Sequence, residues 1–126
     1  VALETLKIYQ ERDILGHVRS VMPRFQQRLA ILADSVLVGE ARGVGLIGAL
    51  ELVMDKSTRE QYPVATKAAP TLAARALARG LIVRPLPGDV IGICPPLIIS
   101  EAQVDELFDS LTAAVTETEE LLRKAA

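Results

Sequence analysis

One arginine stands where it could bind an anion. Arg84 follows the apolar run 81–83 and precedes the rigid sequence Pro-Leu-Pro-Gly at 85–88. The apolar run predicts a strand that ends at Arg84, and the prolines and glycine predict a turn directly after it. A guanidinium held at a strand end presents a planar fork of donors that suits a carboxylate or a phosphate. The competing interpretation is an ordinary surface arginine, which the local pattern alone favours.

Glycines 43, 45 and 48 match the G-x-G-x-x-G pattern of dinucleotide-binding loops. That pattern needs a helix after the glycines, so that the helix N-terminus can bind the pyrophosphate. Residues 49–53 fit a strand as well as a helix, and residues 64–70 lack the acidic residue that would bind the ribose. We therefore interpret Gly43 and Gly45 as structural glycines that permit a tight turn and a twisted strand. A dinucleotide-binding unit is the less favoured alternative.

The other reactive side chains suggest neither a catalytic nor a metal centre. A single histidine and a single cysteine exclude a His-rich metal cluster and an intrachain disulfide. We expect His17 to be a structural residue of a helix and Cys94 to be a small buried residue at a strand end. None of the four lysines has the apolar surroundings of a desolvated Schiff-base lysine; they are Lys7, Lys56, Lys67 and Lys124.

Composition narrows the class of partner. The chain has 126 residues, which suits one domain, and half of them are hydrophobic. Fourteen basic against sixteen acidic residues, with only 3% aromatics, argue against a nucleic-acid-binding surface. No apolar run approaches the ~18 residues of a membrane-spanning helix, and no signal peptide opens the sequence. We expect a cytoplasmic domain with no membrane or nucleic-acid partner.

Apolar spacing predicts the elements that must position these residues. Helical periodicity predicts helices over 1–11, 14–33 and 65–79, and a long last helix that begins after Ser100 with an S-x-x-Q capping box. Short alternating or β-branched runs predict strands near 36–41, 45–53, 81–84 and 90–93. The turns are expected at 42–43 and 85–88. The order α-β-β-α-β-β-α with short connections predicts one α+β domain over 1–126, with an antiparallel or mixed sheet covered by helices.

The beginning of the chain bears on its origin. Residues 1–6 include no initiator methionine, and their apolar side chains already recur at helical spacing. A natural N-terminus usually begins with a loose polar tail. We therefore expect the chain to be a fragment that starts within a helix.

Four segments together resemble the C-terminal small domain of class III aminotransferases. They are residues 3–9, 38–52, 79–84 and 94–101. The second contains the motif R-G-x-G-L at 42–46, and the fourth contains P-P-L-I-I-S-E at 95–101. The segments occur in family order over nearly the whole chain, and the resemblance accounts for the glycine pattern as part of the R-G-x-G-L strand entry.

The resemblance implies a pyridoxal-phosphate enzyme of fold type I, similar to the ω-amine:pyruvate and β-alanine:pyruvate transaminases. In that family the large domain holds the Schiff-base lysine, so we expect neither a catalytic residue nor bound pyridoxal phosphate within residues 1–126. The small domain closes the active site and, in the ω-transaminase branch, supplies an arginine that binds the substrate carboxylate. Arg84 matches that position, although the turn after it is one residue longer than the usual family pattern.

The implied function is the transfer of an amino group between an amine or amino acid and a keto acid such as pyruvate. The resemblance also implies that the parent enzyme is a homodimer. The substrates would be small molecules. The alternative from another class is a non-catalytic ligand-binding or interaction domain. A Schiff-base lysine upstream in the full gene product would decide between them.

Overall fold

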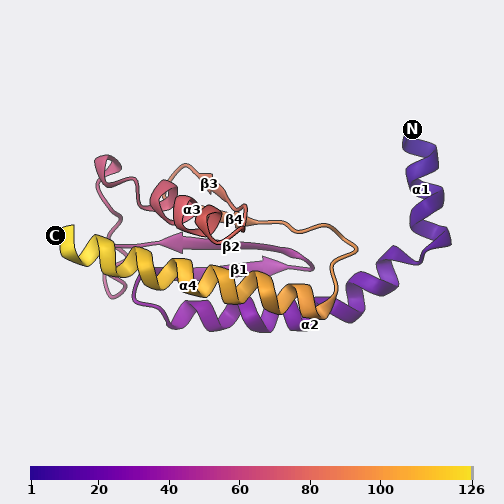
Figure 1. The fold of residues 1–126 in the computed structure, drawn as a ribbon, viewed down its shortest axis with the longest axis horizontal. Helices are drawn as coiled ribbons and strands as arrows, with labels where there is room; N and C mark the ends of the chain where they lie inside the picture. Colours follow the sequence, from indigo (N-terminus) through magenta and orange to yellow (C-terminus); the bar gives the residue numbers. More distant parts are fainter. Residues whose placement is uncertain (126) are drawn as a thin grey trace.

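The computed structural model describes residues 1–125 and shows an α+β fold (Figure 1). Its elements, in chain order, are helices α1 (Ala2–Glu11) and α2 (Ile14–Ile31), strands β1 (Val38–Val44) and β2 (Ile47–Leu52), helix α3 (Ala68–Ala78), strands β3 (Arg84–Leu86) and β4 (Val90–Ile93), and helix α4 (Glu101–Ala125). Short 3-10 turns precede β1 and α3, at Leu32–Asp34 and Val64–Thr66. The predicted order of helices and strands is confirmed.

The four strands form one sheet in the order β1-β2-β4-β3, and every neighbouring pair is antiparallel. Residues directly opposite in such pairs share a face of the sheet. Leu50 therefore lies on the same face as its partner Ile91, and both side chains are fully buried. The opposite face carries Arg84 and its neighbours and is much more exposed. We call this second surface the open face.

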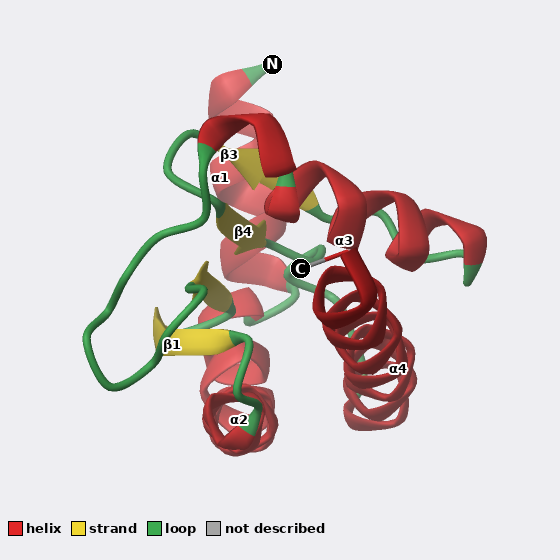
Figure 2. Ribbon diagram, turned by 90° about the vertical axis from the view of Figure 1, so that its left-hand side faces the viewer, coloured by secondary structure: helices red, strands yellow, loops and turns green. Residues whose placement is uncertain are grey.

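Three helices cover the buried face of the sheet and enclose the core (Figure 2). Phe25 of α2 and Phe108 of α4 meet edge to face with ring centroids 5.1 Å apart. Leu72 of α3 and Leu50 of β2 belong to the same buried cluster, and all four side chains have no exposed surface. A fully buried large side chain contributes roughly 1.5–3 kcal/mol. This cluster fixes the helices against the sheet that carries Arg84.

Helix α1 stands apart from this core. The helices α1 and α2 meet at Asp13, whose φ of 45° is left-handed and whose side chain accepts a hydrogen bond from the Gly16 amide. The predicted break near residues 12–13 is confirmed. No residue of α1 is buried, and the helix projects away from the body of the molecule (Figure 1).

Helix α4 begins as the sequence predicts. The Ser100 hydroxyl accepts a hydrogen bond from the Gln103 amide at 3.2 Å, and the Gln103 side-chain oxygen accepts one from the Ser100 amide at 3.0 Å. This reciprocal pair is the capping box. Among residues 1–125, no helix is both long enough and apolar enough to span a membrane.

Two predicted strand boundaries are wrong. The turn between β1 and β2 lies at Gly45 and Leu46 rather than at 42–43, because Val44 still pairs with Ile47. The third strand covers Arg84–Leu86 rather than 81–84, because it is the segment that lies opposite β4. Pro85 is tolerated there because β3 is the edge strand of the sheet.

Candidate functional site

Arg84 is the first residue of β3. The sequence-based prediction that Arg84 ends a strand is therefore wrong. Arg84 pairs with Gly92 of β4, and Gly92 pairs in turn with Ala49 of β2. These three residues form one row across the open face. Because Gly92 and Ala49 are small, the row leaves free space beside the exposed Arg84 side chain.

A pocket of about 590 Å³ occupies this part of the open face. Arg84 is the single charged residue among those that line it, and most of the others are apolar. The lining residues are Ile47, Gly48, Ala49, Ile82, Val83, Arg84, Pro85, Leu86, Gly92, Ile93 and Cys94. Apolar walls around one guanidinium reduce competition from water and strengthen its attraction for an anion.

The open face carries a second arginine whose charge is already balanced. Arg42 Nη1 donates to Glu51 Oε2 at 3.0 Å and lies 3.6 Å from Glu40 Oε1. Among the described residues, Arg84 has no carboxylate and no hydrogen-bond partner of this kind. Arg84 is therefore the arginine of this face that has free donors for a ligand carboxylate.

The two structural glycines lie at the β1–β2 end of the sheet and do not line the pocket. Gly45 sits in the turn with a φ of +58°, a conformation that side chains disfavour. At Gly43 a Cβ atom would lie 2.6 Å from the Ile47 carbonyl oxygen and 2.7 Å from Leu29 Cδ2. The residues after Gly48 form β2 rather than a helix, so the helix N-terminus that pyrophosphate binding requires is not found there.

The remaining candidates have two different outcomes. His17 Nε2 lies 2.9 Å from the Ile99 carbonyl oxygen, a contact that suits the structural role expected for it. Cys94 is exposed, so the prediction of a buried cysteine is wrong. Ile91 and Ile93 take the buried positions of β4, and Cys94, immediately beyond the strand end, lies on the rim of the pocket.

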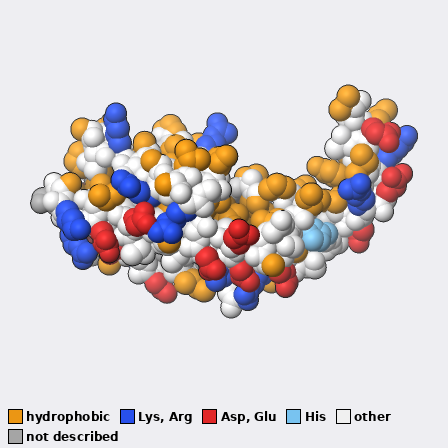
Figure 3. All heavy atoms as spheres, in the orientation of Figure 1, with side chains coloured by type: hydrophobic (Ala, Val, Ile, Leu, Met, Phe, Trp, Pro, Cys, Tyr) orange, Lys and Arg blue, Asp and Glu red, His pale blue; other side chains and the backbone are white. Residues whose placement is uncertain are grey.

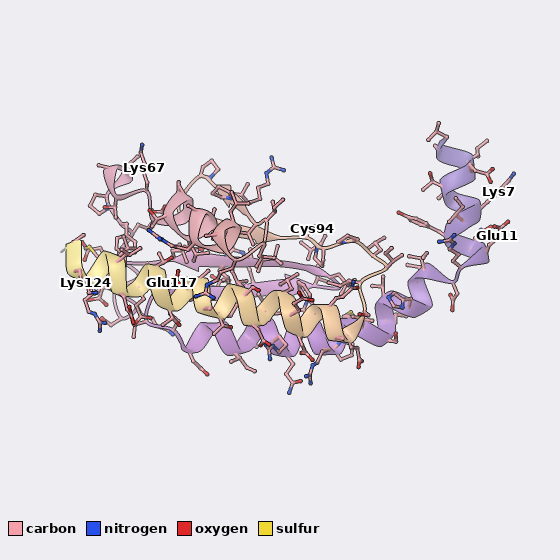
Figure 4. All side chains as sticks on the ribbon, viewed as in Figure 1. Lys7, Glu11, Lys67, Cys94, Glu117 and Lys124 are labelled. Atoms are coloured by element: carbon pink, nitrogen blue, oxygen red, sulfur yellow. The ribbon has the colours of Figure 1, made fainter. Side chains whose placement is uncertain are left out.

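All four lysines are exposed to solvent. Lys7 pairs with Glu4 at 3.5 Å, and Lys56 donates to the backbone carbonyls of Ala33 and Ser35. Lys7 and Lys124 lie at opposite ends of the molecule, away from Cys94 (Figure 4). The residues that line the Arg84 pocket include no lysine. The described residues therefore do not fit the covalent site of pyridoxal phosphate.

Groups with shifted pKa values lie outside the pocket. Two hydrogen bonds of 2.8 Å from Arg24 lower the pKa of the Asp105 carboxyl and raise that of the Arg24 guanidinium. Hydrogen bonds from Ser57 lower the pKa of Asp55. Burial raises the pKa of the Tyr62 phenol, with smaller contributions from nearby carboxylates. The Arg24–Asp105 ion pair joins α2 to α4 and so contributes to the packing of these two helices.

Most of the residues that line this pocket could not be predicted from the sequence. Strand alternation places Ile47 and Ala49 together on one face. It does not show which strand lies beside β2, because pairing between distant segments depends on tertiary packing. Only the register of β4 brings Gly92 and Leu86 to the same surface.

Comparison with known families decides the relationship. The family model "Aminotransferase class-III" matches residues 1–115. The chain belongs to this family. Among curated relatives of this class III aminotransferase chain, "Probable gamma-aminobutyrate transaminase 2, mitochondrial" of Oryza sativa is 43% identical over 120 residues, covering 95% of this chain and 24% of the relative. "Gamma-aminobutyrate transaminase 1, mitochondrial" of the same species is 42% identical over 120 residues, covering 95% and 23%.

Solved structures agree with this assignment. The aminotransferase chain matches "Crystal structure of omega-transferase from Vibrio Fluvialis JS17" with a TM-score of 0.93 and 35% identity, over 99% of this chain and 29% of that one. It matches "PMP-bound form of Aminotransferase crystal structure from Vibrio fluvialis" with a TM-score of 0.89 and 35% identity, over 94% and 26%. The chain spans about a quarter of the length of its curated relatives.

Proposed function

We propose that residues 1–126 are the C-terminal small domain of a longer, pyridoxal-phosphate-dependent aminotransferase, in which Arg84 binds the substrate carboxylate. Membership of the class III family and a solved relative named as a PMP-bound form support the cofactor. The observation that carries the role of Arg84 is its place as the one charged residue lining an apolar pocket.

The proposed reaction transfers an amino group between an amine or amino acid and a keto acid such as pyruvate. Relatives are named as transaminases of γ-aminobutyrate, a molecule that has a carboxylate at the end opposite to its amine. A fixed guanidinium can hold such a carboxylate and so determine where the amine lies. We propose ω-amino acids and short keto acids as the substrate class.

The residues of this chain would contribute binding and orientation to the chemistry. Arg84 would bind the carboxylate through two parallel hydrogen bonds, and the apolar residues Ile47 and Leu86 would exclude water from that ion pair. Pyridoxal phosphate supplies an electron sink when it is bound in such enzymes. The lysine that holds it would belong to the rest of the full-length protein. A homodimer and a cytoplasmic location are part of the same proposal.

The test is single-turnover kinetics of each half-reaction in the full-length enzyme with Arg84→Ala. Loss of a charge-assisted hydrogen bond worth roughly 1.5–3 kcal/mol should lower the efficiency with pyruvate or β-alanine about 10- to 150-fold. The half-reaction with a simple arylalkylamine, which has no carboxylate, should be nearly unchanged. Arg84→Lys should recover little, because an ammonium group lacks the planar fork.

A matched control is Arg75→Ala, which removes an exposed arginine from α3 outside the pocket. This variant should leave both half-reactions unchanged. Equal losses with the amine and the keto acid in Arg84→Ala would show a defect of folding or closure. No loss with either substrate would show that Arg84 is an ordinary surface residue.

A further inference from the structure

The strand that carries Arg84 has a single hydrogen-bonded neighbour in the sheet. Strand β3 has three residues, lies at the edge of the sheet and is exposed along its length. It pairs with β4 alone, and its central residue, Pro85, has no amide hydrogen to donate to the ladder. Val83, directly before Arg84, is buried in the core and anchors the start of the strand. The direction of the Arg84 side chain therefore also depends on how the other end of β3, at the hairpin turn, is anchored.

The anchor at this end is Asp89, in the turn at the tip of the hairpin. Asp89 Oδ1 accepts a hydrogen bond from the Ala69 amide at 3.0 Å, in the first turn of α3. The Asp89 carbonyl oxygen accepts a second bond, of 2.9 Å, from the Leu52 amide at the end of β2. One residue thus ties the hairpin tip to a helix and to a second strand.

The helix end that Asp89 reaches has no cap of its own. The residue at the N-cap position of α3 is Lys67, which makes no side-chain capping bond. Helix N-termini leave backbone amides without partners and favour negative charge, so a carboxylate is well matched to this position. Asp89 also has a φ of +54°, a conformation that aspartate, asparagine and glycine tolerate better than other residues.

We propose that Asp89 is a positioning residue for Arg84: by capping α3 from the hairpin tip, it holds β3 so that the guanidinium faces the substrate pocket. Asp89 itself does not line the pocket. The inference rests on the proposed function of Arg84. It concerns the turn after Arg84, where the capping contact adds to the single-ladder pairing of β3.

The test compares Asp89→Gly with Asp89→Asn in the full-length enzyme. Both replacements accept the positive φ, but only asparagine keeps an oxygen that can accept the Ala69 hydrogen bond. Asp89→Gly should raise the KM for a carboxylate substrate such as β-alanine about 2- to 13-fold, the range that corresponds to the loss of one hydrogen bond. Its kcat/KM for a simple arylalkylamine should stay near wild type, and Asp89→Asn should recover most of the loss.

The double variant Asp89→Gly with Arg84→Ala separates positioning from general stability. If Asp89 acts through Arg84, its replacement should add no further loss for β-alanine once the guanidinium is gone. Equal losses for both substrates, full additivity in the double variant, or equal behaviour of the glycine and asparagine variants would each overturn the proposal.

Failure of the positioning role can be distinguished from failure of the proposed function. A selective loss in Arg84→Ala without one in Asp89→Gly would overturn only the role of Asp89. Absence of any selective loss in Arg84→Ala would overturn the proposed function and, with it, this inference.

Discussion

A guanidinium that already has carboxylate partners gains little from a further anion, whereas an unpaired one retains its full capacity. Arg42 and Arg84 illustrate this difference on the same face of one sheet. Arg42 lies between Glu40 and Glu51, and its charge is balanced by them. Arg84 lies beside apolar residues and has no carboxylate partner among the described residues, so its donors are free for a ligand. The surroundings of the two residues, rather than their type, distinguish the ligand-binding candidate.

The glycines at 43 and 45 resemble each other in sequence but serve different physical needs. Gly45 is needed for its positive φ, since a Cβ atom there would meet nothing within 4 Å. Gly43 is needed for close approach, because its Cβ would clash with the Ile47 carbonyl. The sequence predicts that both are structural, but only the position of the turn shows which need applies to which residue.

Replacement of Gly45 by valine should therefore destabilise the fold through backbone strain. We expect Gly45→Val to lower the free energy of unfolding by about 1–3 kcal/mol, measured by urea denaturation. Gly45→Asn is the matched control, because asparagine tolerates a left-handed conformation, and it should cost clearly less. Equal losses in the two variants would contradict an explanation based on positive φ.

If the glycines are structural and do not bind a dinucleotide, titration with NAD should give no saturable binding to the wild-type chain.

At the scale of elements, the helices could be predicted more accurately than the sheet. The capping box at Ser100 and the break at Asp13 are local signals, and both predictions are confirmed. Strand β3 is not a local feature. Residues 81–83 have higher β-propensity than Arg84–Leu86, yet Ile82 is 84% exposed and unpaired. Pairing with β4 outweighs the higher intrinsic β-propensity of residues 81–83. Arg84 is therefore the first residue of a strand and not the last.

The contact between α2 and α4 gives a pH-dependent prediction. Because the hydrogen bonds from Arg24 lower the pKa of Asp105 in the folded state, the unfolded state binds the proton more readily. The stabilisation is fully present above the unfolded pKa of about 3.9 and is lost as the pH falls through the lower folded pKa. Asp105→Asn should reduce stability at neutral pH, and its difference from wild type should shrink below about pH 4.

The measurement is urea denaturation of both proteins across the acid range. The matched control is Glu106→Gln, which neutralises an exposed carboxylate at the next position of the same helix. This control should change stability much less at every pH. A difference between Asp105→Asn and wild type that stays constant down to pH 2 would contradict a role for the ionised carboxylate.

At the scale of the whole molecule, the apolar surface is unevenly distributed. Val44, Ile47 and Ile82 are between 58% and 84% exposed at the open face, whereas the buried face is covered by three helices. Apolar side chains also gather along the hollow between the body and α1 (Figure 3). Exposed apolar patches of this kind favour association. The same open face carries the pocket at Arg84.

The 126-residue chain alone should therefore fold but self-associate while retaining no pyridoxal phosphate. Sedimentation should show a mass that rises with concentration, and Ile82→Ser should reduce this association without affecting stability, because Ile82 is already exposed. A wild-type chain that stays monomeric at high concentration would contradict the first part of this prediction.

The prediction that the chain alone retains no pyridoxal phosphate follows from the surroundings of its lysines. A lysine that binds an aldehyde stably needs an apolar site and groups that hold the rest of the cofactor, and all four lysines of this chain are exposed. Incubation with pyridoxal phosphate followed by desalting should leave no visible absorbance from a lysine-bound cofactor. Borohydride reduction before desalting should label several lysines weakly, as peptide mapping would show. A stable adduct at one specific lysine would reveal a cofactor site in this chain. It would contradict the proposal that the cofactor-binding lysine belongs to the rest of the full-length enzyme.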